Sequence, residues 1–194
     1  TSGRGSQTAA IGFGGYSTQV EDATEEYDGT SWTNGGDLNN ARSFIGAAGD
    51  STAALGFGGY NSGAKNQVES YDGSSWTNGT AIGTARYSAC YGGTQTAAII
   101  AGGNIYPTTN TVVLSEEWNG SAWSEGNDMI TKRAQMGPAG NQTDIIAWGG
   151  IDPGGPTGYI AVTEGYDGTS WSTRPSMATA RMSFSPSGSY NTTT

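Results

Sequence analysis

The chain has 194 residues, among them 33 glycines, six tryptophans and ten tyrosines, with a single cysteine and no histidine. Its formal net charge of −9 provides no basic surface for phosphates, so we expect no nucleic-acid partner, and no apolar run is long enough for membrane insertion. The absence of histidine excludes Ser-His and Cys-His nucleophile pairs and imidazole-ligated metal sites, and we expect no metal and no cofactor.

Short strand patterns joined by glycine-rich turns follow one another along the chain, which predicts an all-β fold with a single domain. The first pattern, at residues 8–16, predicts the second strand of a four-stranded unit. The next unit is complete, and its four strands are predicted at residues 44–49, 52–60, 68–71 and 75–78. Residues 182–188, near the end of the chain, again predict a first strand.

Four blocks share one pattern, in which a glycine pair is followed by E-x-(Y/W)-(D/N)-G-(T/S)-(S/A)-W and then by a closing arginine. The tryptophans and the closing arginines keep the same spacings of 44, 47 and 48 residues. Residues that recur in every block are expected to serve the fold, and the glutamates to pair with a closing arginine or with backbone. These scaffold residues are Glu25, Glu69, Glu116 and Glu164, Trp32, Trp76, Trp123 and Trp171, and Arg42, Arg86, Arg133 and Arg181.

The glycine pair, the E-x-Y-D step and the tryptophan at a fixed offset resemble the kelch repeat. This resemblance implies a β-propeller over residues 1–194, with four blades of four antiparallel strands. The blades would span about residues 5–48, 49–92, 93–139 and 140–187, with 188–194 as a closing tail. The wording T-Q-T-A-A, G-G-Y and T-E-E-Y-D-G-T-S-W also resembles kelch-like repeat proteins of marine tailed phages.

The order of the predicted strands suggests how such a ring would close. The chain would open in a second strand and end in a first strand, so we expect residues 182–188 to pair with the strand that begins near Thr8. The alternative is that the four repeats are part of a longer array.

The remaining candidates for chemistry are few. Cys90 is predicted to be a small buried hydrophobic residue, because no base or cation in its segment would activate the thiol. The pairs Glu25-Glu26 and Glu116-Glu117 are the closest candidates for the two catalytic carboxyl groups of a glycosidase. A catalytic residue is needed once per site, whereas a glutamate recurs at this position in every block. We therefore expect that the chain is not an enzyme.

Binding is expected in the loops between second and third strands, which differ most between the blocks. They offer aromatic rings, amides and a carboxylate, namely Tyr16, Tyr60, Asn61, Asn104, Tyr106, Asp152 and Tyr159. Together with the phage-like wording, this predicts a virion or extracellular domain, such as part of a tail fibre or a surface decoration. Its partners would be a host surface glycan or protein, or other virion proteins, and a homo-oligomer is compatible with this. The alternative is a cellular lectin-like or protein-docking propeller.

Overall fold

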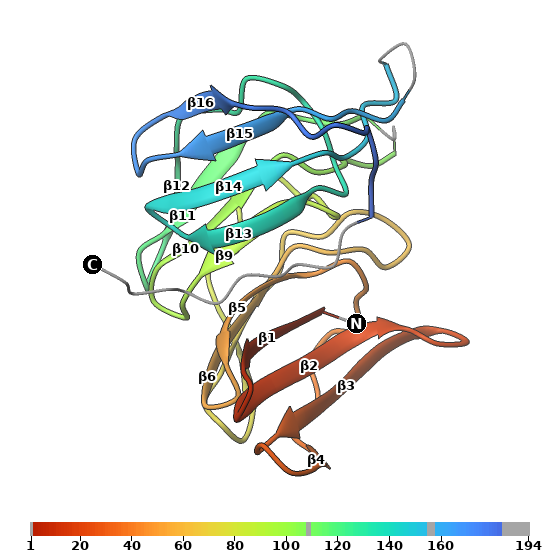
Figure 1. Ribbon diagram of the computed structural model, residues 1–194. Helices are drawn as coiled ribbons and strands as arrows, with labels where there is room; N and C mark the ends of the chain where they lie inside the picture. The colour runs from red at the N-terminus through yellow and green to blue at the C-terminus, as the bar shows by residue number, and fades with distance from the viewer. Residues whose placement is uncertain (1, 108–109, 155–157, 184–194) are drawn as a thin grey trace.

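The computed structural model describes residues 2–107, 110–154 and 158–183, and all regular secondary structure in them is β-strand. Within these described residues, sixteen strands form four antiparallel sheets, each built from four strands that are consecutive in the chain. The sheets are the blades of a four-bladed β-propeller (Figure 1), which confirms the all-β prediction of four blades with four strands each.

The blades are numbered in chain order. Blade 1 contains β1 (Ser2–Ser6), β2 (Ala9–Tyr16), β3 (Val20–Tyr27) and β4 (Trp32–Asn34), and blade 2 contains β5 (Gly46–Asp50), β6 (Ala53–Phe57), β7 (Val68–Tyr71) and β8 (Trp76–Asn78). Blade 3 contains β9 (Cys90–Gly93), β10 (Ala98–Ala101), β11 (Ser115–Trp118) and β12 (Trp123–Glu125), and blade 4 contains β13 (Gly137–Asn141), β14 (Asp144–Trp148), β15 (Thr163–Tyr166) and β16 (Trp171–Arg174).

The turn between the third and fourth strands of each blade follows from its Asp-Gly or Asn-Gly step. In blade 1, Oδ1 of Asp28 accepts hydrogen bonds from the backbone N–H groups of Thr30 and Ser31, at 2.8 and 2.9 Å. Gly29 adopts a φ of 99°, which a residue with a side chain rarely adopts. The same side-chain bonds recur at Asp72, Asn119 and Asp167. These turns hold the short outer strand of each blade in register.

The core lies between neighbouring blades. The inner strands contact one another in the order β1, β5, β9, β13, and three hydrophobic clusters fill the spaces between successive blades. Between blades 1 and 2, for example, Phe13 packs edge-on against the ring of Trp76, with centroids 4.7 Å apart. The buried faces of the sheets are therefore the faces that meet a neighbouring blade, and blades 2 and 3 bury both of their faces.

The N-terminal blade corrects one sequence prediction, because the chain opens in a first strand and not in a second. Residues 2–6 form β1 and pair with β2, whose other edge pairs with β3. Both edges of the strand that begins near Thr8 are thus occupied without the C-terminal segment. The segment predicted to close the ring, residues 182–188, lies outside the described residues from 184 onward.

In the described residues, no helix is long and apolar enough to cross a membrane.

Candidate functional site

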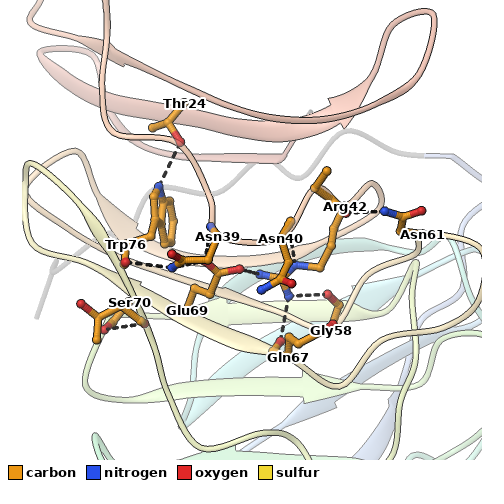
Figure 2. A network of polar contacts seen from close by, with 12 residues as sticks. Thr24, Asn39, Asn40, Arg42, Gly58, Asn61, Gln67, Glu69, Ser70 and Trp76 are labelled. Atoms are coloured by element: carbon orange, nitrogen blue, oxygen red, sulfur yellow. Dashed lines mark hydrogen bonds and ion pairs between the residues drawn. The ribbon is translucent and has the colours of Figure 1, made fainter.

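The recurring arginine and glutamate residues meet between blades, as Figure 2 shows for Arg42 and Glu69. Three of the four closing arginines reach forward to the glutamate of the next blade, with N···O distances of 2.8 Å for Arg42–Glu69, 3.0 Å for Arg86–Glu116 and 3.3 Å for Arg133–Glu164. All three arginine side chains are fully buried. Burial lowers the pKa of Arg42, and the adjacent Glu69 carboxylate opposes that shift. These residues bind blade to blade.

The tryptophans reinforce two of the same contacts. Nε1 of Trp76 donates to Oγ1 of Thr24 in blade 1, and Nε1 of Trp171 donates to Oγ of Ser115 in blade 3, both at 3.0 Å. Trp123 is half-buried, and its Nε1 has no hydrogen-bond partner among the described residues. Trp32, in blade 1, is 55% exposed.

The blades come together around a ring of four side chains, which we call the rim residues. Each rim residue follows its closing arginine by two positions, and together they are Phe44, Ser88, Gln135 and Ser183. Their φ angles are 52°, 53°, 55° and 61°, a left-handed conformation that costs roughly 1–2 kcal/mol for a residue with a side chain. The N–H of Ser88 donates to the carbonyl of Phe44, and that of Gln135 donates to the carbonyl of Ser88.

A cavity of about 430 Å³, the axial cavity, opens beside the rim residues. Residues from all four blades line it, and its apolar lining includes Phe44, Ile45, Met136 and Pro138. No charged side chain is among its described lining residues, although the chain carries a net charge of −9. The site thus offers an apolar wall, hydroxyl groups and one amide, and it has the size of an ordinary small-molecule pocket.

Four aromatic rings extend from the rim across blades 2 and 3, and we call them the aromatic cluster. The ring of Tyr87 lies 6.2 Å from that of Phe44 and 5.0 Å from that of Tyr60, and Tyr60 lies 6.3 Å from Tyr106. Phe44 and Tyr106 are 59% and 56% exposed. Aromatic rings at this exposure offer apolar faces to a partner.

The seven binding residues predicted from the loops divide into two groups. Tyr60 and Tyr106 belong to the aromatic cluster, while Tyr16 and Tyr159 are exposed on blades 1 and 4. The other three have roles within the fold. The side-chain amide of Asn61 donates to the carbonyl of Ala41, Asn104 is buried in a bridge to Tyr87, and Asp152 lies 3.7 Å from Lys132 and contacts Thr111.

The four rim residues, and Tyr87 of the aromatic cluster, are absent from the binding residues predicted from the sequence. That prediction considered only the loops after the second strands. The positions directly after the closing arginines vary as strongly, with Ser43-Phe44 in one block and Ala134-Gln135 in another. Bridges such as Ser43 to Tyr60 place these positions beside the loops. Variation at a fixed distance from the arginine was the available sequence signal.

The side chains considered as catalytic candidates are either buried or engaged in hydrogen bonds within the fold. Burial raises the pKa of the Cys90 thiol to about 12. Glu26 accepts a hydrogen bond from the hydroxyl of Tyr71, and Glu117 accepts one from Tyr166. Among the described residues, no three His, Cys, Asp or Glu side chains are grouped closely enough to hold a metal ion.

Comparison with protein-family models found no match for this chain, and a search of curated proteins found no relative.

Proposed function

We propose that this chain is a non-enzymatic recognition domain that holds a host surface glycan or protein against its rim residues and aromatic cluster. The observation that carries this proposal is Phe44. Its ring is 59% exposed, its backbone is left-handed, and it stands at the mouth of the axial cavity. All four rim positions share the left-handed backbone, which therefore belongs to the fold, and the exposed ring is the feature particular to Phe44. Exposed aromatic rings gather at binding sites.

The chemistry of the site favours an uncharged carbohydrate. Aromatic rings pack against the C–H faces of sugars, and Ser88, Gln135 and Ser183 supply hydroxyl and amide groups for sugar hydroxyls. A charged sugar would meet no partner of opposite charge among the described lining residues. A monosaccharide or disaccharide end is therefore the ligand class that these side chains suit.

The absence of catalysis is part of the proposal, and the placement of the acidic residues supports it. Glu116 is buried in an ion pair with Arg86, and Glu26 and Glu117 accept tyrosine hydroxyls between blades. None of these carboxylates lines the axial cavity. A glycosidase needs two carboxyl groups that flank one bond of the substrate.

The resemblance of the repeat to kelch sequences, and of its wording to marine tailed phages, supports a virion setting, such as a tail fibre or a surface decoration. A cellular lectin-like or protein-docking propeller would use the same face. In that case the exposed rings of the aromatic cluster would pack against a protein, as aromatic residues do at interfaces.

The test is a glycan array that contains matched neutral and acidic oligosaccharides, followed by calorimetric titration of the bound sugar. We expect neutral sugars to bind, and Phe44→Asn to weaken binding by about tenfold or more while the melting temperature holds, because asparagine tolerates a left-handed backbone. Ile130→Asn, which removes a similarly exposed apolar side chain outside the cavity, is the control. Binding that survives Phe44→Asn would contradict the proposed site.

A further inference from the structure

The contact between successive blades is built from the same parts each time, and it has two different sides. The leading blade contributes a closing arginine, and the following blade contributes a glutamate from its third strand. This buried pair joins blade 1 to blade 2, blade 2 to blade 3 and blade 3 to blade 4. The donor side and the acceptor side of the contact are therefore distinct surfaces.

Further residues on the acceptor side always point back to the leading blade. The side-chain amide of Gln95, in blade 3, donates to the carbonyls of Ala54 and Tyr71 in blade 2. Gln142, in blade 4, makes the equivalent bonds to Ala98 and Trp118 in blade 3. The acceptor side thus consists of a glutamate, a tryptophan and, in blades 3 and 4, a glutamine before the second strand.

Blade 1 also has this acceptor side, and no blade covers it in residues 2–107, 110–154 and 158–183. Glu25 stands at the repeat position of Glu69 and is exposed, and Gln7 stands at the position of Gln95 and is also exposed. The Trp32 side chain is 55% exposed, whereas Trp76 at the same repeat position is 6% exposed. Three groups that are covered between other blades are open to solvent here.

Blade 4 presents the matching donor side. Arg181 follows β16 as Arg42 follows β4, and it is exposed, whereas Arg42, Arg86 and Arg133 are fully buried. No ion pair joins Arg181 to Glu25 in the part of the chain that the structure describes. One molecule therefore displays both halves of an interface that it forms three times internally.

We propose that these two faces bind each other between copies of this chain, with Arg181 of one copy paired to Glu25 of a second copy. Blade 4 of the first copy then covers Trp32 of the second, as blade 1 covers Trp76. Two different surfaces meet in such a contact, so the association is head-to-tail. The opposite charges of Arg181 and Glu25 select this partner in an acidic chain whose copies otherwise repel one another.

The test uses two charge reversals, Glu25→Arg and Arg181→Glu, in sedimentation velocity over a range of protein concentrations. We expect the wild-type chain to self-associate and each variant alone to associate more than about tenfold more weakly, because like charges then face each other. An equimolar mixture of the two variants should associate again, since Arg181 of one meets Glu25 of the other.

The controls separate this contact from general effects of charge and from misfolding. Glu125→Arg changes an exposed glutamate of β12 outside the contact and should leave association unchanged. Both reversed residues are exposed, so circular dichroism should show folded variants. A monomeric wild-type chain, or a mixture that stays monomeric, would overturn the proposal. The double variant Glu25→Arg with Arg181→Glu gives a further check. If it is monomeric and melts at a higher temperature than either single variant, residues 25 and 181 pair within one chain, and the proposal is overturned. The readout is independent of the glycan titration.

Discussion

Replacing Glu69 with glutamine tests whether the repeated ion pairs hold the blades together. Oε1 of Glu69 lies 2.8 Å from Nη2 of Arg42, and Oε2 accepts hydrogen bonds from the backbone and side-chain N–H groups of Asn39 at 2.7 and 2.9 Å (Figure 2). Glutamine keeps the size of the side chain and removes its charge. The Arg42 guanidinium is then left buried without a counter-ion.

The expected cost follows from that uncompensated charge. Breaking a buried ion pair from one side destabilises proteins by about 3–5 kcal/mol. Nη1 of Arg42 still donates to the carbonyls of Gly58 and Gln67, at 2.9 and 2.8 Å, which favours the lower end of that range. For a chain of this length, a loss of about 3 kcal/mol lowers the melting temperature by roughly 6–12 °C. Urea denaturation followed by circular dichroism measures the free energy directly.

The repeat supplies a matched control in Glu25→Gln. Glu25 occupies the same repeat position but is exposed, so its replacement should change the free energy of unfolding by less than about 0.5 kcal/mol. The comparison is made at protein concentrations where the chain is monomeric. Equal costs at the two positions would refute the reasoning, because the effect would then come from the strand position and not from the buried arginine.

Two further predictions concern buried side chains. Val68 stands at the repeat position of Thr24 and Ser115, whose hydroxyl groups accept a hydrogen bond from the tryptophan of the next blade. The corresponding Trp123 Nε1 has no acceptor among the described residues. Val68→Thr would supply one and should therefore raise the free energy of unfolding by about 1 kcal/mol in urea denaturation. A clear destabilisation would contradict this. Burial raises the pKa of the Cys90 thiol from 9 to about 12, so iodoacetamide should leave the folded protein unmodified at pH 8. Because the thiol loses its proton more easily in the unfolded chain, its contribution to the free energy of unfolding should fall as pH rises from 9 towards 12. Rapid labelling of folded protein would show an accessible thiol.

The arrangement of strands within a blade could be predicted from the sequence because local residues determine it. The Asp-Gly and Asn-Gly turns fix the outer hairpins through bonds that span three residues, such as those of Asp28 to Thr30 and Ser31. The glycine pairs adopt positive φ in every blade, as Gly58 and Gly59 do at 64° and 108°. Such features act over a few positions and repeat, so a single chain shows them four times.

The first strand of blade 1 was missed because residues 2–6 have the sequence S-G-R-G-S, which lacks the apolar residues that indicate a strand. It pairs with β2, and its side chains bond to backbone in or beside the inner strands of blades 2 and 3. Arg4 donates to the carbonyls of Ala47 and Tyr91, and Ser2 donates to the carbonyl of Ile45. A glycine followed three residues later by threonine, as in Gly5 to Thr8 and Gly49 to Thr52, was the repeat feature that marked this strand.

The candidate site could be predicted only in part, because its geometry depends on residues that are distant in the sequence. Phe44, Ser88 and Gln135 lie more than 40 residues apart, and they line one cavity only when the inner strands gather around a common axis. The variable loops pointed to Tyr60 and Tyr106, whose ring centroids the structure places 6.3 Å apart, but not to the rim residues beside them. A propeller brings equivalent positions together at its axis, so variation at those positions matters more than variation at the edge of a blade.

The repeated glutamates show what a repeat can and cannot predict. Glu25 and Glu69 occupy the same repeat position in the third strands of their blades, yet Glu69 is buried against Arg42 and Glu25 is exposed. The difference comes entirely from the presence of a leading blade. A recurring residue therefore identifies the contact that a blade can make, and only the three-dimensional arrangement identifies which copies make it. Glu25 and Arg181 are the two members of the repeated pair that are exposed, so the surfaces around them are where we expect two copies of the chain to associate.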